Sequence, residues 1–386
     1  MLLLATKVWE QRKLGTITDT YSGGTPQVSV KDYYSNNEIP FIRSSDIHKN
    51  KTELYISSKG LENSSAKLVS KGHILYALYG ATSGEVDVSK IDGAINQAVL
   101  CINAHNDLNY FLMLFLSKNK DKIVRKYIQG GQGNLSASII KKIKVFTTSK
   151  LEETKISNLV KILSDIIALY ERKTRLLGKV RTFLTQRLFS NSSKVSLYFD
   201  NKNWSEHKIS EFLTERNEKV VPNSSIPLVS FTVEKGVTPK SKRYNREFLV
   251  KDDNKKYKIT KKDDIVYNPA NLKFGAIARN KFGNAAFSPI YVTFITKLNP
   301  AFTEFLVRRK NFINLALKYQ EGTVYERMAV KSKDFLNLKI YLPNSSRDIN
   351  HIAQILQSLD TLVSLNKNKV SLITLIKKEL LNTMFI

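Results

Sequence analysis

Two stretches of the chain, residues 149–189 and 345–385, share one pattern of apolar and polar positions. They align at an offset of 196 residues, so that Leu163 matches Leu359. Within each stretch apolar residues recur at alternating steps of three and four, which is the spacing of a coiled-coil helix. Neither stretch contains proline, and each begins with a serine followed three positions later by an acidic residue, a capping-box pattern. The pattern therefore predicts two long helices that pair with each other.

The predicted contact between the helices is a seam of apolar residues that polar residues interrupt at matching levels. The interruptions are Tyr170 and Lys173 in the first helix and Asn366 and Lys369 in the second, and such residues can set the register of a coiled coil. Two unrelated amphipathic core helices are the alternative, but caps, length and interruptions would not then repeat together. The predicted seam residues are Leu159, Leu163, Ile166, Leu177, Val180 and Leu184 in the first helix and Ile355, Leu359, Leu362, Ile373, Ile376 and Leu380 in the second.

The repeat extends beyond the helices. The two tryptophans of the chain, Trp9 and Trp204, begin similar segments, and an Ile-Pro pair at residue 39 recurs at residue 226. The predicted fold class is therefore α/β (α+β): two similar globular domains separated by two long helices that form an antiparallel coiled coil. The predicted boundaries are 1–148 for the first domain, 149–190 for the first spacer helix, 191–343 for the second domain and 344–386 for the second spacer helix.

Charge indicates the class of partner. The formal net charge is +27 in a chain of 386 residues. The first 193 residues contain 28 Lys and Arg against 16 Asp and Glu, and the remainder contains 33 against 18, so both halves are basic. A polyanion, and nucleic acid rather than a membrane surface, is the expected partner. A generally basic, solubilising surface is the alternative.

Several classes of protein do not fit the composition. One cysteine, Cys101, excludes a disulfide framework, and the five histidines show no metal-ligand spacing. We expect a protein of the reducing cytoplasm that holds no metal of its own. No apolar run approaches the roughly 20 residues that a membrane-spanning helix needs.

Six short motifs together resemble a known family, the specificity subunits of type I restriction-modification systems. The motifs are Trp9–Gly15, Gly23–Pro26, Ile39-Pro40, Ser64–Lys67, Tyr79–Thr82 and Asn96-Gln97. The resemblance covers the whole chain, including both long helices. It implies that each globular part is a target-recognition domain for one half of a bipartite DNA site. It also implies that the coiled coil sets the spacing and docks two modification subunits.

The resemblance also assigns the chemistry to other chains. The modification subunits would methylate adenine with S-adenosylmethionine, and restriction subunits would add translocation and cleavage driven by ATP with Mg²⁺. The chain itself would be no enzyme, would have no catalytic residues and would bind no cofactor. Its expected partners are double-stranded DNA, two modification subunits and the restriction subunits.

Residues that follow predicted strands are the candidates for DNA contact. Bases are read by amides, hydroxyls and the forked donors of Arg and Lys, whereas phosphates take Lys, Arg and backbone N–H groups. Solvated loops would have the same composition. The candidates are Arg43, Ser44, Ser45, Tyr79, Thr82, Gln129, Gln132 and Asn134 in the first domain, and Lys240, Lys242, Arg243, Lys273, Arg279, Thr323, Tyr325 and Arg327 in the second.

Other functions remain as alternatives. Ile265–Ala270 is similar to the Asn-Pro-Pro-aromatic motif of adenine methyltransferases, but Ala270 replaces the second proline and Asn271 the aromatic residue. No Gly-rich cofactor loop after a strand accompanies it. A nuclease needs clustered carboxylates around a metal, and the acidic residues near Glu152 fit the first turn of a helix better. A third alternative is a basic coiled-coil scaffold that binds DNA without reading its sequence.

Overall fold

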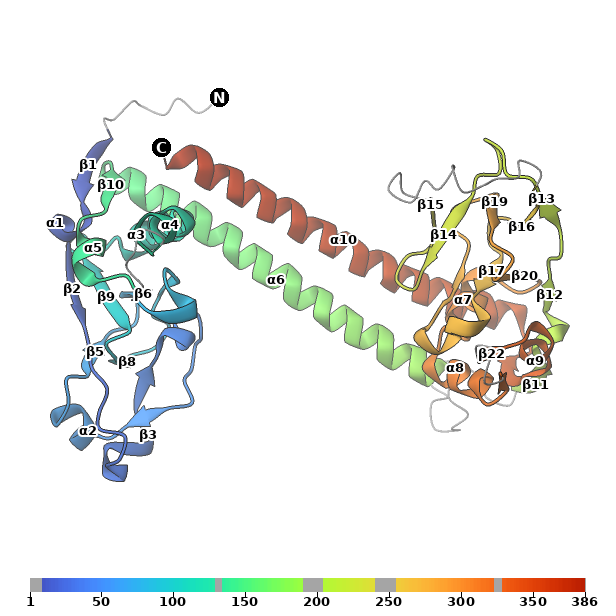
Figure 1. Ribbon diagram of the computed structural model, residues 1–386, viewed down its shortest axis with the longest axis horizontal. Helices are drawn as coiled ribbons and strands as arrows, with labels where there is room; N and C mark the ends of the chain where they lie inside the picture. The colour runs from blue at the N-terminus through green and yellow to red at the C-terminus, as the bar shows by residue number, and fades with distance from the viewer. Residues whose placement is uncertain (1–8, 129–133, 190–203, 240–254, 323–327, 386) are drawn as a thin grey trace. The chain divides into compact units, whose positions relative to one another are not determined.

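The structure is a computed structural model that describes residues 9–128, 134–189, 204–239, 255–322 and 328–385 (Figure 1). The chain divides into two compact units. Unit 1 comprises Met1–Glu171 and Asn368–Ile386, and unit 2 comprises Arg172–Lys367. Each unit contains one globular part and one half of each long helix.

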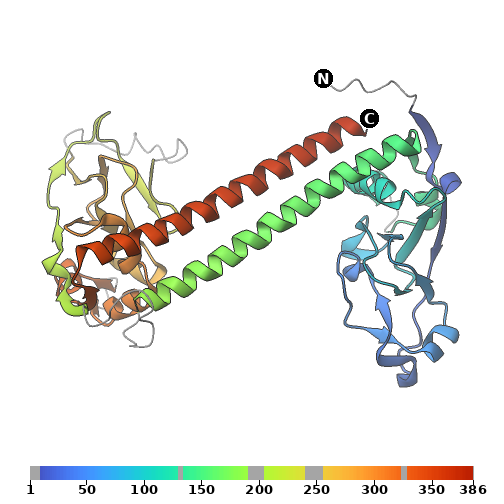
Figure 2. The same cartoon turned by 180° about the vertical axis from the view of Figure 1, so that it is seen from behind.

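The long helices are α6 (Lys150–Leu188) and α10 (Ser346–Met384), each of 39 residues. Ser149 and Ser345 begin them as predicted, since each side-chain oxygen accepts the backbone N–H three residues later at 3.4 Å. In unit 1 the first turns of α6 and the last residues of α10 enter the same core. In unit 2 the end of α6 meets the first turns of α10 in the same way. The two helices are therefore antiparallel within each unit (Figures 1 and 2).

The burial pattern along the helices differs from the predicted seam. Seven predicted seam residues are half-buried, whereas Leu159, Val180, Ile355, Leu362 and Ile376 are exposed. Each helix has two apolar stripes, and the residues of one directly precede the residues of the other. The predicted seam combined residues from both stripes. The inner stripe, at half-buried or buried positions, is Leu163, Ile167, Tyr170, Thr174, Leu177, Arg181 and Leu184 on α6 and Leu359, Val363, Asn366, Val370, Ile373, Lys377 and Leu380 on α10.

The inner stripe contains more polar residues than the predicted seam. Asn366 is buried, and Lys369 lies 5.3 Å from the ring centre of Tyr170. Arg181 forms an ion pair with Asp360 in unit 2. Tyr170 is half-buried and Asn366 is buried, which agrees with the prediction that these two residues interrupt the contact between the helices. Lys173 and Lys369, which were predicted at the same contact, are exposed. Only packing distinguishes the two stripes, because both have helical spacing.

The globular part of unit 1 is built on two four-stranded sheets. One has the order β2-β9-β6-β7 and is antiparallel, and the other has the order β4-β3-β8-β5, with β3 parallel to β8. Strand β1 pairs with β10 beside the root of α6. The strands are β1 (Glu10–Lys13), β2 (Thr18–Ser22), β3 (Tyr34–Ile42), β4 (Tyr55–Ile56), β5 (Lys67–Val69), β6 (Ile74–Ala77), β7 (Val86–Val88), β8 (Gly93–Ile95), β9 (Val99–Ala104) and β10 (Lys144–Thr147).

Helices cover the first of these sheets. In both views α3 and α4 lie beside the first half of α6 (Figures 1 and 2). The core between them contains Phe111, Leu114 and Leu116 from α3 together with Ile156 and Val160 from α6. The helices are α1 (Leu14–Ile17), α2 (Ser58–Glu62), α3 (Asn109–Lys118), α4 (Lys120–Ile128) and α5 (Ala137–Lys141), with short 3-10 turns η1 (Lys31–Tyr33), η2 (Ser44–Asp46) and η3 (Gly80–Thr82).

Unit 2 repeats the first sheet and changes the second. The order β12-β20-β17-β18 is the equivalent of β2-β9-β6-β7, but the second sheet has only β13-β16-β19, accompanied by the hairpin β14-β15. Leu228 forms a parallel bridge to Ala286, as Phe41 does to Ala94 in unit 1. The Ile-Pro pairs therefore precede equivalent parallel contacts.

The strands of unit 2 are short, with two to five residues each. They are β11 (Trp204–Lys208), β12 (Leu213–Glu215), β13 (Lys219–Val220), β14 (Val229–Thr232), β15 (Gly236–Pro239), β16 (Tyr257–Thr260), β17 (Ile265–Tyr267), β18 (Ile277–Arg279), β19 (Ala285–Phe287), β20 (Val292–Thr296), β21 (Gln320–Glu321), β22 (Ala329–Val330) and β23 (Lys339–Pro343). Strand β11 pairs with β23, as β1 pairs with β10.

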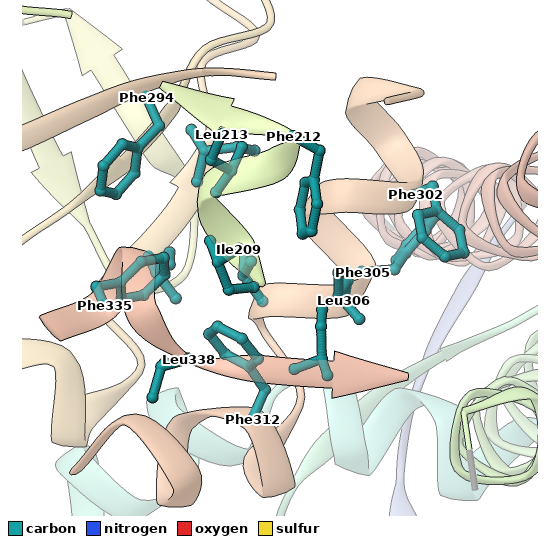
Figure 3. Packing of buried hydrophobic residues seen from close by; sticks show 14 of the residues in the cluster. Ile209, Phe212, Leu213, Phe294, Phe302, Phe305, Leu306, Phe312, Phe335 and Leu338 are labelled. Carbon is teal, nitrogen blue, oxygen red and sulfur yellow. The ribbon is translucent and has the colours of Figure 1, made fainter. Parts of the chain in front are cut away.

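The core of unit 2 joins this sheet to its helices and to both long helices. Figure 3 shows Leu306 of α7 beside Ile209 and Phe312. Phe302 lies on the opposite side of α7, where its ring centre is 5.4 Å from that of Phe189. The helices are α7 (Pro300–Val307), α8 (Lys310–Leu317) and α9 (Ser332–Asn337), with 3-10 turns η5 (Ile209–Glu211) and η8 (Pro269–Phe274).

Candidate nucleic-acid interface

In unit 1 the ends of several strands meet at the turn Asn96-Gln97 between β8 and β9. Strands β3 and β8 are parallel, and Ile42 lies opposite Ile95. The next residues along the two strands, Arg43 and Asn96, therefore lie side by side. The Gly23 N–H donates to the Asn96 carbonyl at 3.3 Å, and the Leu78 N–H donates to the Ala98 carbonyl at 2.9 Å. The turn therefore brings together loops that are far apart in the sequence.

The Gly23-Gly24 pair has a packing role in this arrangement. A Cβ atom on Gly23 would lie 1.8 Å from the carbonyl oxygen of Ile95, and one on Gly24 would lie 2.7 Å from Cβ of Ser65. Next to the pair, the Thr25 hydroxyl donates to Oε1 of Gln97 at 2.8 Å. Glycine is needed here so that the loop can approach β8 and the 64–67 segment.

Three more candidates lie near the end of β6. Tyr79 is 38 % exposed and begins the turn that contains Thr82, whose hydroxyl donates to the Tyr79 carbonyl at 3.4 Å. Asn134 is exposed, and its neighbour Leu135 donates its N–H to the Leu78 carbonyl at 3.0 Å. We call the combined surface the strand-end loop cluster: residues 22–26, 43–46, 78–82, 96–98 and 134.

A buried carboxylate positions Arg43 in this cluster. Asp46 is 3 % exposed and accepts hydrogen bonds from Arg43 Nε at 3.1 Å and from Lys49 Nζ at 2.7 Å. Burial alone would raise the pKa of the Asp46 carboxyl, but the hydrogen bonds from Lys49 and Arg43 outweigh burial and lower its pKa. Ser45 is exposed beside it and Ser44 is half-buried. Asp46 therefore holds the Arg43 guanidinium through its Nε edge, and the other N–H groups of the guanidinium remain available to a ligand.

In unit 2 the corresponding surface follows β17. The Asn268 side chain accepts the N–H groups of Ala270 at 3.1 Å and Asn271 at 3.3 Å and so caps η8. At the end of η8, Lys273 is exposed and its ammonium lies 5.0 Å from the ring centre of Phe274, which is 63 % exposed. Gly275 ends the turn in the left-handed region, with φ 81°. This turn presents a cation and an aromatic face together.

The structure does not present Arg279 as expected. Its guanidinium contacts Asp263 and Glu304 at 3.3 Å each, and its side chain is only 16 % exposed. Lys281 and Arg308 also contact the buried Glu304. Arg279 therefore supports the surface from below. Gln129, Gln132, Lys240, Lys242, Arg243, Thr323, Tyr325 and Arg327 lie outside the described residues.

Two exposed side chains were missing from the sequence candidates. Gln97 stood in a motif of the family resemblance, but only the fold shows that it lies at the centre of the loop cluster. Nothing in the sequence singled out Phe274, because an aromatic residue within an apolar segment is normally assigned to the hydrophobic core. Among the described residues no group of His, Cys, Asp and Glu has the arrangement of a metal site. No helix of the described chain has the length and apolarity to cross a membrane.

Residues 6–178 match the family model of the type I restriction modification DNA specificity domain. The matched segment includes every residue of the strand-end loop cluster. The match covers the globular part of unit 1 and most of α6. It confirms the family that the six sequence motifs indicated.

The chain is also similar to individual specificity subunits. The type I restriction enzyme MjaIX specificity subunit of Methanocaldococcus jannaschii is 24 % identical over 289 residues, which cover 68 % of this chain and 66 % of that protein. A crystal structure of a type I restriction-modification S subunit from M. genitalium has 14 % identity and a TM-score of 0.63, covering 100 % of this chain and 98 % of that chain. A structure from work on complex assembly and conformational transition of the type I R-M system has 12 % identity and a TM-score of 0.51, covering 99 % and 98 %. At these identities the structures establish the fold, and they confirm the predicted fold class.

Proposed function

We propose that this specificity-family chain reads a bipartite DNA target, with each globular part contacting one half-site. The observation that carries the proposal is the strand-end loop cluster, which lies within the matched specificity domain and exposes Arg43, Tyr79 and Gln97 together. An amide and a guanidinium are the groups that distinguish base pairs in the major groove. The net charge of +27 supports attraction to the phosphate backbone.

We propose that catalysis resides in other subunits. The Asn268 amide, the best candidate for a methyltransferase role, is 7 % exposed and its oxygen is occupied by two backbone N–H groups. A methyltransferase needs that amide free to hold the target amino group. S-adenosylmethionine would therefore bind to modification subunits, and ATP with Mg²⁺ to restriction subunits.

We propose that modification subunits dock on an outer apolar stripe of the long helices. The stripe consists of exposed or half-buried apolar residues: Leu159, Ile162, Ile166, Leu169, Leu176, Val180 and Phe183 on α6, and Ile355, Leu362, Leu365, Leu372 and Ile376 on α10. It lies one residue, or about 100°, around each helix from the inner stripe. Since the helices are antiparallel, this displacement brings both outer stripes of a unit to one face. Apolar faces of this kind are buried by partner helices.

We also propose that the length of the helices sets the distance between the half-sites. Each has 39 residues and is thus roughly 58 Å long. A basic scaffold that ignores sequence would need no such fixed length. Nor would it need a glycine pair that fits the loop cluster so closely to β8.

A half-site exchange tests the proposal. The chain would be produced with its modification subunits, with residues 194–343 replaced by the same region of a relative, and methylated sites would be mapped by long-read sequencing. We expect one half of the target to change while the gap between halves stays the same. A change in both halves would contradict the two-reader model.

A point variant tests the loop cluster itself. Gln97→Ala should weaken discrimination at one base pair of the first half-site by about 1–3 kcal/mol, because a base-reading amide is lost. Gln27→Ala, an exposed glutamine outside the cluster, is the matched control and should leave the target unchanged. Equal behaviour of the two variants would remove the cluster from the interface.

A further inference from the structure

The outer stripe of α6 has charged flanks that differ sharply between the two units. The residues immediately before Leu159, Ile166, Lys173 and Val180 border the stripe along one side, at the positions that flank a coiled-coil seam. From unit 1 to unit 2 they are Asn158, Asp165, Arg172 and Lys179. Flanking charges are what select the partner in paired helices.

The charge change extends over the whole helix. Within residues 150–171 of α6 there are three Lys and four Asp or Glu. Residues 172–188 contain six Lys or Arg and no acidic residue. The half of α6 that belongs to unit 2 is therefore strongly basic, while the half in unit 1 is close to neutral.

The internal repeat does not contain this basic flank. At the offset of 196 residues, Arg172 corresponds to Asn368 and Lys179 to Leu375, and the remaining flank positions of α10 are Gln354, Thr361 and Asn382. The apolar stripe is thus repeated on both helices, whereas the charge is confined to half of one. Packing of the helix pair does not require it.

Three of the cations in this half of α6, Arg172, Arg175 and Lys179, are exposed. No carboxylate of the described residues forms an ion pair with these three. Arg181, on the inner stripe, has Asp360 as its partner. Like charges three and four residues apart on a helix repel each other, so the cluster opposes helix stability slightly.

We propose that the unit 2 half of α6 binds a partner helix with acidic flanking residues. This inference rests on the proposed docking of modification subunits and names the chemistry of the docked helix. Leu176, Val180 and Phe183, which are 50 %, 46 % and 55 % exposed, lie beside the cations. An apolar stripe with a charged border fits a protein helix, whereas a DNA backbone would leave the apolar side chains in water. Acidic residues of that helix would pair with Arg172 and Lys179.

The test measures binding of the purified modification subunit to the full chain at low and high salt. In the double variant Arg172→Glu/Lys179→Glu, we expect about a tenfold or greater loss of affinity at low salt, because attraction becomes repulsion. The wild-type affinity should fall as salt rises, and the variant should lose this dependence. The control Lys367→Glu/Lys378→Glu reverses two exposed lysines of α10 that directly follow inner-stripe residues, on the side away from the outer stripe, and should bind like wild type.

A second variant distinguishes the inference about an acidic partner helix from the docking proposal on which it rests. Leu176→Asp/Phe183→Asp removes the apolar contact and should abolish binding at that face. If this variant fails to bind but the Arg172/Lys179 reversal binds normally, docking stands and the acidic-partner inference is overturned. If neither variant changes binding, the docking site lies elsewhere and both ideas fail. Normal subunit binding with weakened DNA binding in the reversal would identify DNA as the partner of these cations and would also overturn the inference.

Discussion

The two units use different chemistry at one equivalent place in their matching sheets. In unit 1, Tyr21 on β2 faces Cys101 on β9, and His73 approaches the thiol at 3.6 Å. In unit 2 the corresponding positions hold Arg216, Thr293 and Asp264. There the Arg216 guanidinium donates two hydrogen bonds to Asp264, at 2.8 and 3.0 Å, and both side chains are almost fully buried.

This difference shows which side chains the sheet can accommodate at these equivalent positions. Burial raises the pKa of both Tyr21 and Cys101, the latter to about 11, so unit 1 buries neutral groups. The hydrogen bonds that Arg216 donates to Asp264 raise the pKa of Arg216, so unit 2 buries a pair of opposite charges. Either the neutral groups or the ion pair can occupy these positions in the sheet, because a buried polar group needs only a hydrogen-bond partner within the same unit.

The ends of the long helices show a second contrast. Lys118 donates to the carbonyl oxygens of Asn382 and Phe385 at the end of α10 in unit 1. In unit 2, Arg309 donates to the Phe189 carbonyl at 3.2 Å and lies 4.1 Å from its ring centre. Phe189 and Phe385 are equivalent in the repeat. A cation closes the C-terminus of each arriving helix, where the helix dipole favours positive charge.

The largest expected effect comes from breaking the buried ion pair. Asp264→Ala should destabilise unit 2 by about 3 kcal/mol, because it leaves the buried Arg216 charge with only the exposed Glu218 as a partner. His73→Ala, the matched change in unit 1, should cost about 1 kcal/mol or less. Urea unfolding followed by tryptophan fluorescence can assign the losses, because Trp204 reports on unit 2 and Trp9 on unit 1.

A double variant sharpens this comparison. Arg216→Met/Asp264→Leu should recover most of the lost stability, since apolar residues can replace a buried pair. A cost for the double variant as large as that of Asp264→Ala would mean that hydrogen bonds, rather than charge matching, hold this position.

A smaller effect concerns Glu153, a buried carboxyl where unit 2 has Ile349. Desolvation raises its pKa, although the Thr148 N–H bonds to it at 2.9 Å. The protonated form therefore stabilises unit 1 below the ordinary pKa of glutamate, about 4.3, and that contribution is lost as pH rises through the raised value. Glu153→Gln should stabilise unit 1 at neutral pH and have little effect in acid. Urea midpoints from a Trp204→Phe background measure this, with Glu152→Gln as the control. Equal midpoints at neutral pH would contradict it.

The smallest expected effect is the pH dependence of His207 in unit 2. Its Nδ1 lies 2.7 Å from Glu211 and its Nε2 lies 2.7 Å from Ser205, and the hydrogen bond to Glu211 raises its pKa. The stabilisation is complete below the ordinary histidine pKa of about 6.5 and is lost as pH rises through the raised value. The unfolding midpoint reported by Trp204 should therefore fall slightly from mildly acidic to mildly alkaline pH. His207→Gln should remove that fall, and a persistent fall would exclude His207 as its source.

The sequence determined the long helices, their caps and the repeated core, because these depend on local spacing and on residue types that recur at one offset. It also indicated the family, since six short motifs occur together. It did not determine which apolar stripe is buried: Leu159 and Leu163 both have helical spacing, and only packing leaves the first exposed and the second half-buried.

The strand-end loop cluster was decided by tertiary structure for a related reason. Gln97, Gly23 and Leu78 are far apart in the sequence and meet only because β2, β6 and β8 end, and β9 begins, at one place. Arg279 has the composition of a contact residue, yet two carboxylates hold it below the surface. Residue type can state what a side chain is able to bind. Whether it faces a ligand or its own neighbours depends on contacts that no local pattern contains.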